Sequence, residues 1–107
     1  MAQKKNSLRI IGGTWRSRRI QFVDIPEIRP TPDRVRETLF NWLETKIVGA
    51  SCLDLFAGSG VLGFEAASRG ASEVIQVDVN ETIVATLSQQ KQLFTAQQIH
   101  ILQQDAL

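Results

Sequence analysis

The chain has 107 residues, of which 43% are hydrophobic and 21% are charged, and its formal net charge is +1. This length is typical of one domain and excludes a large α/β enzyme, and the hydrophobic content excludes a disordered chain. No apolar run approaches the roughly 20 residues that span a bilayer, no signal-peptide pattern is present, and one cysteine excludes a disulfide framework. We therefore expect a cytoplasmic protein with no membrane segment and no metal site.

The charge is distributed unevenly along the chain. Residues 1–46 carry +5, whereas residues 47–107 carry −4. Six cationic residues precede Asp24, the first acidic residue. Halves of opposite sign suggest a basic arm that meets a polyanion, although a solvated basic face would have the same composition.

Residues 8–22, LRIIGGTWRSRRIQF, predict a β-hairpin. Leu8 and Ile10 alternate with polar neighbours, and Gly12 and Gly13 supply a turn signal. The prolines that follow, at 26, 30 and 32, end this unit. We therefore expect a basic hairpin arm and linker over residues 1–28 and a second unit over residues 29–107.

Residues 29–43, RPTPDRVRETLFNWL, predict a helix. Thr31 can act as its N-cap, and Pro32 suits the first helical position, where a missing N–H has no cost. The apolar residues recur at helical spacing and predict one buried face, made of Val35, Leu39, Trp42 and Leu43.

The rest of the chain alternates between strands and helices. Strands are expected over residues 51–56, 73–78 and 98–102, and helices over residues 60–69 and 81–94, the second capped by Asn80. Such βαβ units predict an α/β protein with a Rossmann-like, doubly wound, mostly parallel sheet covered on both faces. Because three strands leave an edge open, we expect this to be the N-terminal half of something longer.

Gly58, Gly60 and Gly63 match the G-x-G-x-x-G spacing of a dinucleotide site, which by itself is a weak signal. No Walker lysine follows them, which argues against a P-loop NTPase. Asp54 stands just before this turn. A carboxylate about 4 Å from a phosphate would cost about 4 kcal/mol at an effective dielectric of 20, or roughly a thousandfold in affinity, so NAD fits poorly.

S-adenosyl-L-methionine carries an ammonium and a sulfonium and no phosphate, so an acid there would attract it. Asp78 ends the second expected strand, where a carboxylate can accept hydrogen bonds from ribose hydroxyls. Asp105 follows the third and could accept from the adenine amino group. Singly, Asp54 could be a satisfied structural carboxylate, Asp78 a turn residue and Asp105 a surface acid.

The segment DLFAGSG resembles motif I of class I S-adenosylmethionine-dependent methyltransferases. Together with LRIIGGTWRSRRI and RPTPDRVRETLFNWL, it resembles the bacterial family that methylates the exocyclic N2 of a guanine in 16S ribosomal RNA. The resemblance implies a methionine-end cradle around the glycine turn, the ribose at Asp78 and adenine at Asp105. Thr31 and Arg34 could reach the cofactor carboxylate, although a capped core helix would explain them almost as well. The cofactor-binding residues expected on these grounds are Thr31, Arg34, Asp54, Phe56, Ala57, Gly58, Ser59, Gly60, Asp78, Val79, Asp105 and Ala106.

The resemblance also implies an RNA partner, either 16S ribosomal RNA or the assembling small subunit, and a monomer at full length. The basic hairpin would bind it, and anchoring of the hairpin is the alternative role for its tryptophan. The family's [DN]-P-P-[FY] motif, which contacts the target base, is absent, because the only prolines are at 26, 30 and 32. We therefore expect no catalytic residue in this chain, and a non-catalytic RNA-binding module is the alternative. The expected RNA-binding residues are Arg9, Trp15, Arg16, Arg18 and Arg19.

Overall fold

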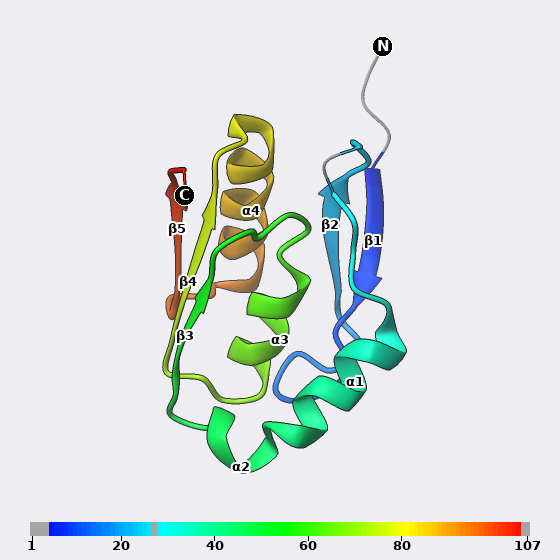
Figure 1. Cartoon of the computed structure of the whole chain (residues 1–107), viewed down its shortest axis with the longest axis vertical. Helices are drawn as coiled ribbons and strands as arrows, with labels where there is room; N and C mark the ends of the chain where they lie inside the picture. The colour runs from blue at the N-terminus through cyan, green and yellow to red at the C-terminus, as the bar shows by residue number, and fades with distance from the viewer. Residues whose placement is uncertain (1–4, 27, 106–107) are drawn as a thin grey trace.

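The computed structural model describes residues 5–26 and 28–105. A two-stranded antiparallel sheet comes first, and it is followed by two helices and a βαβαβ unit (Figure 1). The elements in chain order are β1 (Lys5–Arg9), β2 (Arg19–Val23), α1 (Asp33–Trp42), α2 (Glu44–Ile47), β3 (Ser51–Asp54), α3 (Val61–Ser68), β4 (Glu73–Asp78), α4 (Glu81–Phe94) and β5 (Ile99–Gln103).

The βαβαβ unit forms a three-stranded parallel sheet in the order β3-β4-β5, which confirms the predicted α/β, Rossmann-like class. Asp54 pairs with Gln76 and Asp78 pairs with Gln103, so β4 continues two residues beyond its last partner in β3. The carboxyl ends of the strands therefore form a stepped edge, along which the polar side chains of the candidate site lie.

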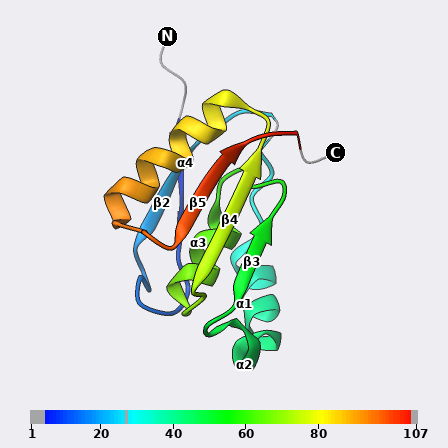
Figure 2. The same cartoon turned by 90° about the vertical axis from the view of Figure 1, so that its left-hand side faces the viewer.

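In Figure 2 one face of the sheet is turned to the viewer, and helices α3 and α4 lie on the opposite face. The strands follow one another in a single direction across the sheet, and right-handed crossovers then place both helices on the same side. Leu53 and Leu102 on the other face are 62% and 45% exposed. Within the described residues, the expected helical cover is therefore present on one face of the sheet only.

The hairpin prediction is confirmed in its strands, and Gly13 has the positive φ of a turn glycine. Leu8 pairs with Ile20, but residues 10–18 form a connection longer than a tight turn. This connection packs on α3, where the Thr14 N–H donates to the Ser68 carbonyl at 2.8 Å. Gly13 has φ +81°, and a Cβ there would lie 1.9 Å from the Ser68 oxygen. The glycine thus serves a close approach between backbones.

The predicted start of α1 was wrong, and its predicted buried face is confirmed only for Leu39 and Leu43, which pack against the core. The helix begins at Asp33 with Pro32 as its N-cap residue, and no side chain caps it, so Thr31 does not have that role. Val35 and Trp42 are 54% and 78% exposed, whereas Arg36 and Phe40 are buried. A periodicity read from apolar residues alone treats an arginine as a surface residue, and the buried acid that draws Arg36 inward lies far away in the sequence.

The hairpin, α3 and α4 share one core. The Trp15 and Phe94 rings meet edge to face at 5.1 Å, and Phe64 and Phe94 at 5.4 Å. The Asn80 side chain accepts from the amides of Thr82 and Ile83, which confirms it as the cap of α4. Ile83, Leu87 and Phe94 are buried, as their spacing predicts. A boundary at residue 28 stays a prediction about domain organisation, because residues on both sides of it contribute to the same core.

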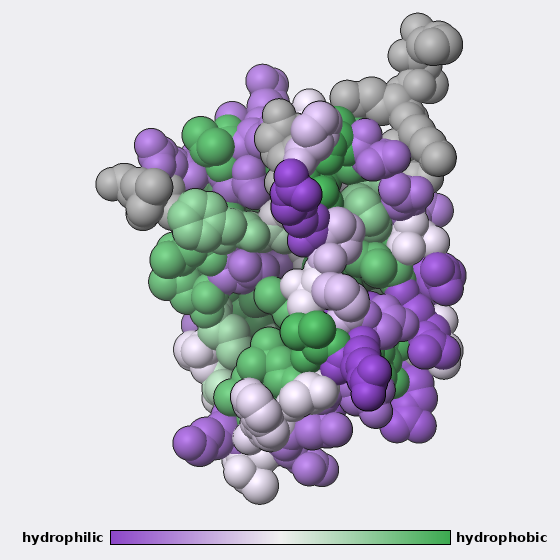
Figure 3. Space-filling view, turned by 45° about the vertical axis from the view of Figure 1, so that its right-hand side comes forward, coloured by the Kyte–Doolittle hydropathy of each residue, from purple (hydrophilic) through white to green (hydrophobic). Residues whose placement is uncertain are grey.

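Large apolar side chains also remain on the surface. In the space-filling view, hydrophobic surface gathers on the left and hydrophilic surface on the right (Figure 3). Several of these side chains lie on β3 or just after β3 or β4, at the edge where ligands bind in open parallel sheets. The exposed large apolar residues are Val35, Trp42, Val48, Leu53, Leu55, Phe56, Val79, Leu93 and Leu102. In the described part of the chain, no helix is long and apolar enough to cross a membrane.

Candidate functional site

The glycine turn lies between the end of β3 and the start of α3. Its Ala57 N–H donates to the Val77 carbonyl at 3.0 Å, which fastens the turn onto β4. Gly60 has φ +82° and precedes the helix, and a Cβ at this position would meet Leu87 at 2.4 Å. The glycine therefore satisfies both a left-handed backbone and a close contact with α4.

Asp78, at the end of β4, binds the turn through its carboxylate. One oxygen, Oδ2, accepts from the Gly58 N–H at 3.1 Å, and Oδ1 accepts from the Asn80 N–H at 2.9 Å. The side chain is half-buried. Asp78 thus joins the glycine turn to the start of α4 and keeps part of its carboxylate accessible.

Two hollows flank the turn. We call the first, of about 190 Å³, the loop hollow, because residues 29–31 form one wall of it. We call the second, of about 430 Å³, the Asp78 hollow. Phe56, which is 69% exposed, and Gly58 line both. The loop hollow is lined by Arg29, Pro30, Thr31, Phe56, Ala57, Gly58, Ser59, Val61 and Leu62, and the Asp78 hollow by Phe56, Gly58, Asp78, Val79, Asn80 and Ile83.

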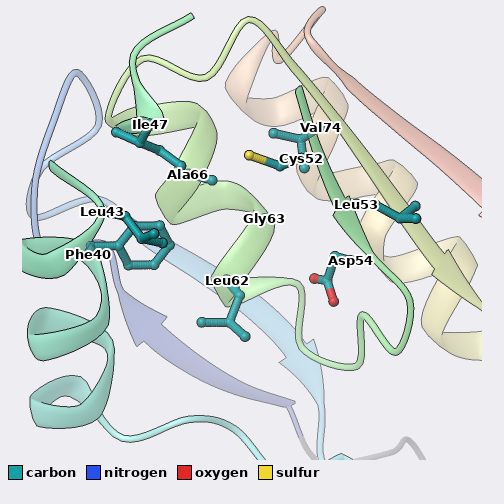
Figure 4. A pocket seen from close by; sticks show the side chains of 10 residues that line it. All are labelled: Phe40, Leu43, Ile47, Cys52, Leu53, Asp54, Leu62, Gly63, Ala66 and Val74. Carbon is teal, nitrogen blue, oxygen red and sulfur yellow. The ribbon is translucent and has the colours of Figure 1, made fainter. Parts of the chain in front are cut away.

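Asp54 lines neither of these hollows. Its half-buried side chain lies between β3 and α3, at one end of an apolar pocket of about 170 Å³ whose other residues include Cys52 and Gly63 (Figure 4). The Gln76 amide donates to Asp54 Oδ2 at 3.5 Å and to the Gly60 carbonyl at 3.0 Å. We call the glycine turn (residues 57–60) and Asp78, with the hollow on each side of them, the rim. Asp54 lies beneath the rim and is linked to the glycine turn through Gln76.

This position changes the acidity of Asp54. Burial raises the pKa of its carboxyl above the ordinary value of 3.8, and the nearby charge of Asp78 raises it further. Hydrogen bonds from Gln76 and from the Phe56 N–H oppose these effects on the pKa. The carboxylate contributes negative potential to the rim from below, and a direct contact with a ligand in either hollow has no support from its placement.

The other expected cofactor residues are spread more widely. Thr31 lines the loop hollow and Val79 the Asp78 hollow. Arg34 lies on the outer side of α1 with Val35 and Trp42 and lines neither hollow. Asp105 is exposed two residues beyond β5, and Ala106 falls outside the described residues.

The hairpin arginines, Arg9, Arg16, Arg18 and Arg19, are exposed. The Arg18 guanidinium lies 3.9 Å from the centre of the Phe94 ring and donates to the Leu93 carbonyl at 3.4 Å. Arg19 donates to the Ser7 hydroxyl at 2.9 Å, and Arg9 lies 3.7 Å from Asp33. Trp15 is only 8% exposed, which favours the anchoring role over stacking on a base.

Sequence reasoning missed several residues that shape the rim. Arg29 and Pro30 open the segment RPTPDRVRETLFNWL that carries part of the resemblance, and neither was expected as a site residue until the loop hollow showed them in its lining. Asn80 was recognised as a cap, while its place in the Asp78 hollow depends on the turn between β4 and α4. Gln76 sits inside an apolar strand and is fully buried, so only its contacts with Asp54 and Gly60 show its role.

The hydrogen-bond acceptors of the site fit a ligand that carries hydroxyl and cationic groups. Asp78 offers carboxylate oxygens, and Val79 and Ile83 offer apolar surface for a ring in the same hollow. Two acids near the glycine turn oppose a pyrophosphate there. Within residues 5–26 and 28–105, no group of three or more His, Cys, Asp or Glu side chains could hold a metal ion.

Comparison with known proteins places the chain in a family. A family model described as "Conserved hypothetical protein 95" matches residues 8–107. The protein named "Ribosomal RNA small subunit methyltransferase D" of Escherichia coli K12 is 55% identical over 76 residues, which cover 71% of this chain and 38% of that protein. The Haemophilus influenzae protein of the same name is 43% identical over 105 residues, which cover 96% of this chain and 54% of that protein.

Solved structures agree with this likeness. The structure described as "Putative methyltransferase yhhF from Escherichia coli" has a TM-score of 0.87 and 44% identity, over 94% of this chain and 55% of that one. The chain thus spans about half the length of the relatives it matches, or less. The chain belongs to the family described as conserved hypothetical protein 95, and its resemblance to class I S-adenosylmethionine-dependent ribosomal RNA methyltransferases is confirmed.

Proposed function

We propose that this chain is the cofactor-binding part of an S-adenosylmethionine-dependent enzyme that methylates the exocyclic N2 of a guanine in 16S ribosomal RNA in the cytoplasm. The observation that carries the proposal is the rim itself: a glycine turn held by Asp78, with a hollow on each side of Phe56 and Gly58. The names of the relatives support ribosomal RNA of the small subunit as the substrate. The guanine N2 position rests on the sequence resemblance alone.

The two hollows suit the two ends of S-adenosylmethionine. The Asp78 hollow would hold the adenosine, with Asp78 accepting from ribose hydroxyls and Val79 and Ile83 beside the ring. The loop hollow would hold the methionine end between residues 29–31 and the glycine turn. Asp54 would act on the cationic groups by its charge through the floor of the site. Asp105 and Ala106 remain proposed adenine contacts, and Arg34 remains the least supported member of the set because it lines neither hollow.

The cofactor supplies a methyl group on a sulfonium, which is an excellent leaving group. The protein's part is to bring the guanine N2 within roughly 3–3.5 Å of that carbon and in line with the sulfur. A stacked, extruded base and acceptors for its amino group are the remaining requirements. In the related family, the [DN]-P-P-[FY] motif meets them, and this chain has no such motif.

The absence of that motif keeps a second function open. A basic hairpin on a partial Rossmann-like scaffold could bind RNA without turnover. Both proposals predict RNA binding by the chain, and they differ in whether the longer protein transfers a methyl group.

Methyl transfer distinguishes the two functions. We expect the full-length protein to transfer labelled methyl groups to 16S ribosomal RNA, with N2-methylguanosine as the product after nuclease digestion and mass spectrometry. We expect the 107-residue chain alone to give no product. Methylation of another atom would contradict the guanine N2 assignment, and no transfer by the full-length protein would favour the non-catalytic module.

Replacing Asp78 tests the ribose site. Asp78→Ala should weaken binding of S-adenosylhomocysteine by about 10- to 100-fold, because charge-assisted hydrogen bonds contribute about 1.5–3 kcal/mol. Isothermal titration calorimetry measures this change. The exposed Asp24 provides a control, and Asp24→Ala should leave the affinity unchanged. Wild-type affinity in Asp78→Ala would remove Asp78 from the site.

We expect the charge of Asp54 to lower the stability of the fold and to strengthen cofactor binding. Since its pKa is raised in the folded state, its charge costs stability fully above that pKa, and the cost vanishes below the ordinary value of 3.8. Asp54→Asn should therefore increase the free energy of unfolding at pH 7, and the gain should shrink as the pH falls toward 4. The same variant should weaken S-adenosylmethionine binding about fivefold, the equivalent of about 1 kcal/mol.

Urea denaturation between pH 4 and 8 and calorimetry measure these two effects. Asp24→Asn, measured in parallel, controls for the loss of an exposed carboxylate. A destabilised Asp54→Asn at neutral pH would show that the hydrogen bonds of this carboxylate outweigh its burial.

The salt dependence of RNA binding tests whether the hairpin arginines contact phosphates. Each phosphate that a cation neutralises adds roughly 0.7–0.9 to the slope of log affinity against log salt concentration. Replacing Arg16, Arg18 and Arg19 together with alanine should reduce this slope for 16S ribosomal RNA by about two. Lys46→Ala on α2 serves as the control and should leave the slope unchanged. An unaltered slope and affinity in the triple variant would exclude the hairpin as the RNA-binding arm.

A further inference from the structure

Arg36 on α1 and Glu65 on α3 form a buried ion pair to which the proposed function assigns no role. Both residues have no exposed surface, and Arg36 Nη1 lies 3.3 Å from Glu65 Oε1. Replacing a buried ion pair by apolar residues of similar volume is often neutral or stabilising, so stability alone is a weak reason for this arrangement. The contacts of the two side chains indicate another reason.

The Arg36 guanidinium donates hydrogen bonds to the backbone of two separate segments. Its Nε donates to the Thr31 carbonyl at 3.1 Å, and its Nη1 donates to the Arg9 carbonyl at 2.8 Å. Its Nη2 contacts the Asp33 carboxylate. A planar guanidinium presents its donors in a fixed fork, so these contacts together fix the direction in which the chain enters α1.

Glu65, the other partner of the pair, is also held in place by several hydrogen bonds. Its two carboxylate oxygens accept from the N–H groups of Ile11 and Gly12, each at 2.9 Å, and from Arg69 Nε at 3.0 Å. The residue lies one turn into α3, which begins at Val61 directly after the glycine turn. Glu65 is therefore a rigid extension of the helix that follows the turn.

The pair connects the two walls of one cavity. Thr31, whose carbonyl Arg36 binds, belongs to one wall of the loop hollow, and the glycine turn with Val61 forms the other. We propose that Arg36 is a positioning residue that, through Glu65, holds residues 29–31 at the distance from the glycine turn that the amino-acid end of the cofactor needs. This inference rests on the proposed function, because it assigns the methionine end to the loop hollow.

Arg36→Lys tests the proposal. A lysine keeps the positive charge opposite Glu65 and loses the fork that reaches the Thr31 carbonyl. Two ligands report on the two hollows: S-adenosylhomocysteine has an amino-acid end, and 5′-methylthioadenosine lacks it. We expect Arg36→Lys to weaken binding of the first about tenfold and to leave binding of the second within about twofold. Calorimetry is performed at a temperature at which circular dichroism shows each variant to be folded.

Arg69→Lys is the matched control. Arg69 donates to the same Glu65 carboxylate and does not line the loop hollow, so this variant disturbs the same buried acid without releasing the wall. Arg69→Lys should leave the affinity for S-adenosylhomocysteine relative to that for 5′-methylthioadenosine unchanged. If Arg36→Lys does not fold, Asp33→Ala takes its place, because it removes a half-exposed partner of Arg36 and leaves the buried pair intact. Asp33→Ala should lower the affinity for S-adenosylhomocysteine about threefold relative to that for 5′-methylthioadenosine.

The outcomes separate the inference from the function. Equal losses for both ligands, or the same change in Arg69→Lys, would show that Arg36 only stabilises the fold, and the cofactor assignment would stand. Failure of the wild-type chain to bind either ligand would overturn the proposed function and this inference with it.

Discussion

Glu65 receives donors from three segments of the chain while it is itself fully buried. The connection of the hairpin, helix α1 and helix α3 all meet at its carboxylate, and an uncompensated charge in this position would cost several kcal/mol. Every partner must therefore be present for the acid to remain buried. This requirement brings the connection of the hairpin and helix α1 onto α3, since Gly12 and Arg36 are 53 and 29 residues from Glu65 in the sequence.

The contacts at Glu65 hold one wall of the candidate site, and the end of the parallel sheet holds the other. Asp78 binds the Gly58 amide across the step between β3 and β4, so the glycine turn is fixed before any ligand binds. A preformed turn lowers the ordering cost of binding, which is the general benefit of preorganisation. Asp54 lies one layer deeper, where its charge costs stability and contributes potential to the rim.

The basic hairpin is anchored on the rest of the chain by the element that carries its proposed RNA-binding arginines. Trp15 packs against Phe64 and Phe94, and Arg18 lies over Phe94 from the outer side. These contacts hold the hairpin against α4, and the exposed arginines remain on the surface of the hairpin. Under the proposed function, a hairpin held in this way would present a bound RNA at a fixed distance from the rim.

The sequence by itself determined the order of strands and helices, the cap at Asn80, the glycine turn and the acids at the strand ends, because these signals are local or periodic. Tertiary structure alone decided which face of α1 is buried, since Arg36 turns inward toward an acid 29 residues away. It also decided that Gly13 serves contact with α3, that Trp15 is an anchor, and that Asp54 lies beneath the rim rather than in it. Such outcomes depend on partners brought together by folding, and neither spacing nor composition carries information about those partners.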